Sequence, residues 1–166
     1  KTEKQAFTLQ KIQGTMKSTY AQHLVRGADL NHHETFYAGR CAEWLIESSY
    51  FAIAQYLDTK NVVLLVQHGI NFRFPIALGD IITFESKIVA AGRSTVTVYT
   101  KVYKSNDPDT ISAYGFSTFS NLDHNHTSRA HGLVIKPETA EEAALQQEAS
   151  ELVMESLKHA SRNRRF

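Results

Sequence analysis

The spacing of apolar and polar residues predicts one long helix and five strands. Apolar and small residues recur every three or four positions from Tyr37 to Leu57, which is typical of a helix with one buried face. Period-two alternation predicts strands at residues 15–25, 62–73, 81–90, 95–103 and 111–119. Short, turn-forming segments separate the last four strands, so we expect an antiparallel meander. Because residues 58–136 show no helical pattern, the sheet must cover the helix, which defines an α+β fold.

Three further segments flank this domain of residues 15–122. Residues 1–14 are polar, with little periodicity, and are expected to form a flexible N-terminal arm. Residues 123–136 are polar and read as a loop. A second helix is predicted over residues 137–166, because a proline and acidic residues lie at its start and basic residues lie at its end. Its apolar stripe is narrow, so we expect it to pack peripherally or against a neighbouring subunit.

Composition narrows the possible partners. A net charge of +1 gives no reason to expect nucleic acid as a partner, and no apolar run is long enough to predict a membrane span. The single cysteine, Cys41, excludes an intramolecular disulfide and fits the reducing cytoplasm. Cys41 lies on the apolar face of the predicted helix, so we interpret it as a buried core residue. We expect no cofactor.

The predicted helix carries acidic residues that are candidates for catalysis. Glu43 and Glu47 are four residues apart, and Arg40 precedes Glu43 by three. A carboxylate at either position is able to act as a base or a nucleophile on a carbonyl. The alternatives are a solvated helix edge or, for Glu43, an ion pair with Arg40.

Three motifs in order resemble hotdog-fold acyl-CoA thioesterases. The first is the run from Asn31 through Ala38-Gly39-Arg40 to Glu47. The second, from Phe72 to Asp80, contains a Pro-x-x-x-Gly-Asp turn. The third is Gly92-Arg93-Ser94-Thr95. The resemblance implies a hotdog fold, in which a curved antiparallel sheet wraps one long helix. It also implies hydrolysis of acyl-CoA to a free acid and coenzyme A, in a homo-oligomer whose site lies between subunits.

The resemblance also implies roles for individual residues. Asn31 would hold the attacking water or the thioester carbonyl, although an asparagine in a loop is also a common turn residue. Small residues at Ala38 and Gly39 would let the carbonyl reach the unpaired N–H groups of the helix start, or would only allow close packing. Thr35 occupies a position where some family members have a catalytic Asn or Asp, and Ile46 one where others have an aspartate. Glu47 is one residue further on, about 100° around the helix.

The third motif is a candidate binding site for coenzyme A. The guanidinium of Arg93 and the hydroxyls of Ser94 and Thr95 are suited to phosphate groups, whereas a plain hairpin with a solvated arginine is the alternative.

Two other functions remain open. Because Thr35 and Ile46 replace catalytic residues of the family, the protein is alternatively a non-catalytic one that binds or senses acyl-CoA. Asp29, Asn31 and His33 suggest a hydratase of the same fold as a further alternative. His32 and His33 are interpreted as bystanders in a loop. His124 and His126 lack a nearby cysteine, so no metal site is expected.

Overall fold

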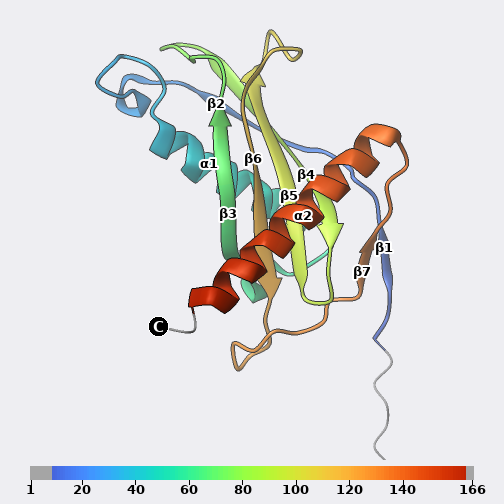
Figure 1. Cartoon of the computed structure of the whole chain (residues 1–166). Coiled ribbons are helices and arrows are strands. Elements are labelled where there is room, and N and C mark those ends of the chain that lie inside the picture. Colours follow the sequence, from blue (N-terminus) through green and yellow to red (C-terminus); the bar gives the residue numbers. More distant parts are fainter. Residues whose placement is uncertain (1–8, 164–166) are drawn as a thin grey trace, which may run out of the picture.

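A five-stranded antiparallel sheet separates the two helices of this computed structural model, which describes residues 9–163 (Figure 1). The strand order is β2-β4-β5-β6-β3, so β2 and β3 form the two edges. The strands of this sheet are β2 (Thr19–Leu24), β3 (Val62–Phe72), β4 (Ile81–Ala91), β5 (Thr95–Lys104) and β6 (Ile111–Asn121). Helix α1 (Ala38–Ile53) lies across one face, and α2 (Ala140–Asn163) packs on the other. The predicted α+β hotdog architecture is confirmed.

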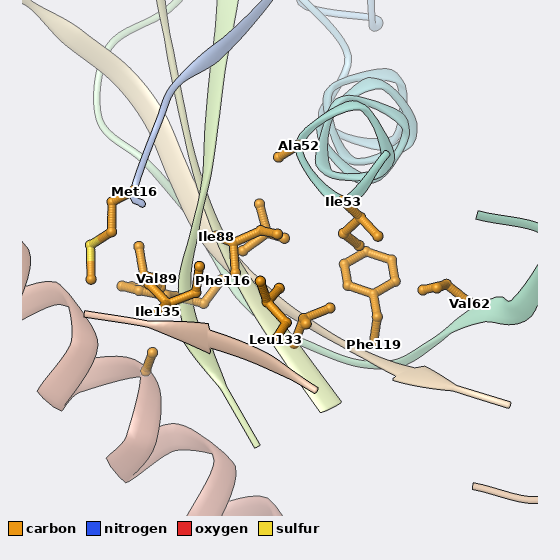
Figure 2. Close-up of a cluster of buried hydrophobic side chains, with 13 residues drawn as sticks. Met16, Ala52, Ile53, Val62, Ile88, Val89, Phe116, Phe119, Leu133 and Ile135 are labelled. Atoms are coloured by element: carbon orange, nitrogen blue, oxygen red, sulfur yellow. The ribbon is translucent and has the colours of Figure 1, made fainter. Parts of the chain in front are cut away.

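Helix α1 is held against the sheet by one continuous buried face. That face consists of Cys41, Trp44, Leu45, Ser48, Ser49, Ala52 and Ile53. The buried hydroxyl of Ser49 donates to the carbonyl of Leu45 at 2.9 Å and lies 3.3 Å from the hydroxyl of Thr100 on β5. Figure 2 shows how the end of the helix enters the core, with Ile53 above the ring of Phe119 and beside Val62.

Helix α1 begins without a side-chain cap. The N-cap is Tyr37, which makes no side-chain capping bond, and the nearby Thr35 does not cap the helix. The Thr35 hydroxyl instead bonds to the Asn31 side chain. The Thr35 hydroxyl is therefore used within the preceding loop, which leaves the helix start open.

The sheet order corrects the predicted meander. Strands β4, β5 and β6 follow one another, but β3 pairs with β6 rather than with its sequence neighbour β4. The chain after β3 therefore crosses from one edge of the sheet toward the other. On the way it contacts the loop before α1, where the Phe36 N–H donates to the Ile76 carbonyl at 2.9 Å. The crossing places residues 72–76, which we call the crossing segment, beside Asn31.

Residues near both ends of the chain form a small second sheet. Strand β1 (Ile12–Gly14) pairs in parallel with β7 (Leu133–Ile135), so the predicted arm over 1–14 and the predicted loop over 123–136 each contain a strand. A strand of three residues is too short for alternation to reveal it in the sequence. Residues 1–8 lie outside the described part of the chain.

Helix α2 is anchored by a few polar and apolar contacts. The Gln146 side chain donates to the carbonyls of Val89 and Ile135, at 3.0 and 3.1 Å, and Ala149 is fully buried. Its outer side leaves Met154 and Leu157 exposed. Among residues 9–163, no helix has the length and apolar character needed to cross a membrane.

The sheet face opposite α1 carries a polar network centred on Glu85. The Glu85 carboxylate accepts from the hydroxyls of Ser18 and Tyr103, at 2.8 and 3.1 Å, and lies 3.2 Å from the Lys101 ammonium. Burial acts to raise the pKa of Glu85, but the Ser18 hydrogen bond and the Lys101 charge outweigh burial and lower it. The network therefore stabilises the ionised carboxylate.

Candidate active site

A cavity of about 290 Å³ lies where the start of α1 meets the loop before it. Four segments meet there: the loop of residues 31–36, the first turn of α1, the crossing segment and the start of β6. Its walls are formed by Asn31, Thr35, Phe36, Ala38, Cys41, Phe72, Arg73, Phe74, Pro75, Ile76, Ser112 and Ala113. Three of the predicted site residues, Asn31, Thr35 and Ala38, are thus brought together.

The orientation of the Asn31 amide is fixed by its neighbours. Its oxygen accepts the backbone N–H groups of His33 and Thr35, at 2.9 and 3.2 Å. Its nitrogen donates to the Thr35 hydroxyl at 3.1 Å, which uses one of its two hydrogens. The acceptor side of the amide is committed to the loop. Asn31 is therefore both a turn residue and a donor with one hydrogen left for a ligand.

The turn that carries Asn31 contains a strained backbone position. Glu34 has a φ of 60°, in the left-handed region that a side chain with a Cβ disfavours. Its N–H donates to the Asn31 carbonyl at 3.0 Å, which closes the turn. The strain therefore lies within the segment that orients Asn31.

The start of α1 presents free backbone donors beside this amide. The first hydrogen bond of the helix runs from the Cys41 N–H to the Tyr37 carbonyl at 3.0 Å, so Ala38, Gly39 and Arg40 have no acceptor within the helix. Ala38 lines the cavity, whereas Gly39 lies under the ring of Tyr37, where an added Cβ would come within 2.5 Å of a ring carbon. Of the two small residues predicted at the site, Ala38 therefore lines the cavity and Gly39 allows close packing of Tyr37.

Asp29 ties the loop to the helix start. Its side chain is fully buried, its Oδ2 accepts the Arg26 N–H at 2.9 Å, and its Oδ1 lies 3.3 Å from Nε of Arg40. Its backbone carbonyl accepts the Tyr37 N–H at 2.8 Å. These contacts hold both ends of the loop that carries Asn31.

The two candidate carboxylates lie on the outer side of α1 and do not line the cavity of their own chain. Glu43 is 2.6 Å from the Arg40 guanidinium, which is the ion pair suggested by their spacing. Glu47 is exposed, and no ion pair within residues 9–163 includes it. Ile46 lies on another side of the helix, because it precedes Tyr50 by one turn and the Tyr50 ring packs 4.9 Å from that of Phe119. That side faces the β3 edge.

Cys41 belongs to the wall of the cavity and to the core. Its side chain is buried, and burial raises the pKa of its thiol to about 12. A thiol with this pKa is protonated at neutral pH and is a poor nucleophile. The interpretation of Cys41 as a core residue agrees with this position.

The hairpin that joins β4 to β5 and contains Arg93–Thr95 lies at the other end of the sheet from the loop before α1 (Figure 1). Thr95 pairs with Ser120, and the Ser94 carbonyl accepts the Asn121 N–H at 2.7 Å. Strand β5 spans 10 residues, or about 30 Å at the usual rise of a strand. One chain therefore does not bring this hairpin to its own Asn31.

His131 fixes the hairpin to the chain that follows β6. Its Nδ1 accepts the Leu133 N–H at 2.9 Å, so Nε2 carries the hydrogen that it donates to the Thr95 carbonyl at 3.0 Å. The His131 N–H also donates to the Arg93 carbonyl at 3.2 Å. The hairpin is therefore held rigidly beside β7.

The crossing segment supplies the cavity residues that the sequence did not predict as site residues. Phe72, Arg73, Phe74 and Ile76 read as the end of a strand and a turn. The only feature of the sequence that pointed to these residues was the motif from Phe72 to Asp80. The rings of the loop histidines His32 and His33 lie 4.0 Å apart, tilted by 43°, and neither residue lines the cavity. Within residues 9–163, no three histidines, cysteines or acids gather as a metal site.

The fold and this site define the chain as a hotdog protein with a cavity at the start of its central helix. The model of the "Thioesterase superfamily" matches residues 33–111. This match covers helix α1 and three strands of the sheet, β3, β4 and β5.

Curated and solved relatives carry related names. The chain is 28% identical over 120 residues to the "Uncharacterized acyl-CoA thioester hydrolase YkhA" of Bacillus subtilis, covering 70% of this chain and 69% of that protein. An acyl-CoA hydrolase of Staphylococcus aureus, solved with butyryl coenzyme A, superposes with a TM-score of 0.79 at 22% identity, covering 93% of this chain and 96% of that one. An acyl-CoA hydrolase of Bacillus cereus has a TM-score of 0.81 at 20% identity over the same shares.

Proposed function

We propose that this protein hydrolyses acyl-CoA thioesters to a free acid and coenzyme A. The observation that carries the proposal is Asn31, which lines the cavity and whose amide oxygen is held by the loop. A thioester carbonyl gains negative charge when water attacks it. A fixed N–H donor next to a helix start stabilises that charge.

Each group then has a distinct task. The Asn31 Nδ2–H and the free N–H groups at the start of α1, with Ala38 as the small residue lining the cavity, bind the carbonyl oxygen. Thr35 orients the Asn31 amide through its hydroxyl. Glu47 removes a proton from the attacking water. We prefer Glu47 to Glu43 because Glu43 is paired with Arg40.

Two copies of the chain supply the complete site. Strand β3 is an open edge with exposed Val63 and Leu65. A two-fold axis beside it pairs the strand with its own copy in antiparallel orientation. The Phe72 end, next to Asn31, then adjoins the Val62 end of the second copy. That end lies near the hairpin, because Val62 pairs with Asn121 and Asn121 bonds to Ser94.

Relatives support an oligomer and a coenzyme A substrate. A solved neighbour described as an "Apo-Hexameric Acyl-CoA Thioesterase" has a TM-score of 0.75 at 22% identity, covering 89% of this chain and 97% of that one. We propose a homo-oligomer whose Arg93, Ser94 and Thr95 bind the phosphates of coenzyme A, with no nucleic acid or membrane partner. The reduced Cys41 and the coenzyme A substrate favour the cytoplasm.

One observation favours a second function, binding of acyl-CoA without hydrolysis. The residues that line the cavity include no carboxylate and no histidine. The solved structures of the Staphylococcus aureus enzyme include alanine variants of an asparagine and an aspartate whose separation equals that of Asn31 and Ile46. Ile46 supplies no carboxylate at that position.

A thiol-release assay separates these functions. Purified protein is incubated with acyl-CoAs of increasing chain length, and free coenzyme A is measured with a thiol reagent. Hydrolysis predicts release with multiple turnovers. Thermal stabilisation by coenzyme A without thiol release would instead identify a binding protein, and consumption of an enoyl-CoA without thiol release a hydratase.

A further inference from the structure

A second cavity, of about 250 Å³, lies beside the Arg93 hairpin and contains a cation from the N-terminal segment. Three parts of the chain line it: the segment before β1, the hairpin, and the start of β7. Its lining residues are Leu9, Lys11, Gly92, Arg93, Gly132, Leu133 and Val134. The Asn31 cavity shares none of these residues.

The position of Lys11 is fixed by close backbone packing. Gly132 has a φ of 75°, and a Cβ added to it would lie 2.3 Å from the Gln10 carbonyl oxygen. The Ile12 N–H donates to the Gly132 carbonyl at 2.8 Å. The segment on both sides of Lys11 is thus held against residue 132. Only glycine permits this approach.

The two cations in this cavity are free to bind a ligand. Lys11 and Arg93 are exposed, and neither takes part in a salt bridge among residues 9–163. No acidic residue lines the cavity. The remaining lining residues are Leu9, Leu133, Val134 and two glycines. Two unpaired cations beside an apolar wall suit a phosphate group attached to a flat, weakly polar ring.

We propose that Lys11, together with Arg93, binds the phosphorylated adenosine end of coenzyme A, and that Lys11 makes the enzyme selective for coenzyme A over pantetheine thioesters that lack this nucleotide. The inference rests on the proposed function for its substrate. What it adds is a role for Lys11 and a binding site in the cavity between Lys11 and the Arg93 hairpin.

Binding of 3′,5′-adenosine bisphosphate tests the inference without catalysis. Its affinity for the full chain is measured by calorimetry with the Lys11→Ala variant, and with Lys17→Ala as the control, because Lys17 is exposed but does not line the cavity. A lost bond to a charged group costs about 1.5 kcal/mol or more, so Lys11→Ala weakens binding about tenfold. Adenosine, which has no phosphate, binds both variants equally.

A kinetic measurement provides the second readout. The ratio of kcat/KM for butyryl-CoA to that for S-butyryl pantetheine falls about tenfold in Lys11→Ala and is unchanged in Lys17→Ala. If both variants bind the bisphosphate equally, the inference is overturned even when the enzyme hydrolyses acyl-CoA. If bisphosphate binding depends on Lys11 but no thiol is released from any acyl-CoA, the nucleotide site stands and the hydrolase proposal fails.

Discussion

The side-chain oxygen of Asn31, a residue that lines the cavity, accepts the backbone N–H of Thr35 at 3.2 Å, which leaves the amide nitrogen as the donor. Asparagine thus performs two tasks, closing the turn and offering a donor. The two tasks are separable by substitution.

Asn31→Asp is expected to slow hydrolysis strongly while leaving the loop intact. A carboxylate accepts the same backbone N–H groups but has no hydrogen to donate at neutral pH. Loss of one oxyanion donor lowers kcat by about 10²–10³-fold. Steady-state thiol release measures this loss, and thermal unfolding shows whether the fold is retained. Asn31→Ala, which removes both tasks, should also lower the melting temperature. Activity in Asn31→Asp close to that of the unmodified protein would exclude the donor role.

Glu47→Gln is expected to lower turnover by about 10²–10⁴-fold, the usual contribution of a general base. Glu43→Gln serves as the matched control, because it breaks only an exposed ion pair with Arg40, and such pairs contribute about 0.2–1 kcal/mol. Single-turnover kinetics with both variants distinguish the two acids. If the chemical step in Glu47→Gln is as fast as in the control, Glu47 does not take part in the mechanism.

Leu65→Lys is expected to give an inactive monomer. Leu65 is exposed on the β3 edge, and a lysine there disfavours pairing with a second copy. Leu24→Lys places the same charge at an exposed position of the other edge strand, β2, and should retain both assembly and activity. Light scattering and thiol release are measured on the same samples. A fully active, monomeric Leu65→Lys protein would contradict a site shared between subunits.

Glu34→Gly is expected to stabilise the protein by about 1 kcal/mol. Glycine adopts a φ of 60° without the steric cost that a Cβ imposes, and this gain exceeds its larger entropy loss on folding. Denaturant unfolding measures the gain. Glu34→Ala keeps the Cβ and should show no comparable increase. Equal stability of both variants would mean that the turn is not strained.

Glu85→Gln is expected to destabilise the protein by about 1 kcal/mol at neutral pH, allowing for solvent screening of a partly exposed network. The folded-state pKa of Glu85 is below its ordinary value of 4.5. Its contribution is therefore complete above about pH 4.5 and is lost as the pH falls through the folded-state pKa. The difference in unfolding free energy between the two proteins should thus disappear in acid. Glu148→Gln, at an exposed position of α2, serves as the control for the substitution itself.

The sequence predicts where the helices and strands lie along the chain better than it predicts which strands pair with one another. Alternation indicates that residues 62–73 form a strand, but not that this strand pairs with β6 at an edge. That edge position sends the crossing segment past Asn31, so Arg73 and Phe74 enter the cavity through topology rather than through a local pattern. The pair of Arg40 and Glu43, in contrast, follows from a spacing of three residues on a helix, and the sequence anticipated it.

The pairing of Ile12 with Leu133 has a consequence for the order in which the protein forms. Strand β1 leaves the ribosome early, yet its partner strand is synthesised only after the whole sheet. Contacts between such distant parts of a chain form late, because loop closure opposes them. Lys11 therefore joins Arg93 only when the nascent chain is nearly complete, and the proposed nucleotide cavity is among the last parts of the protein to mature.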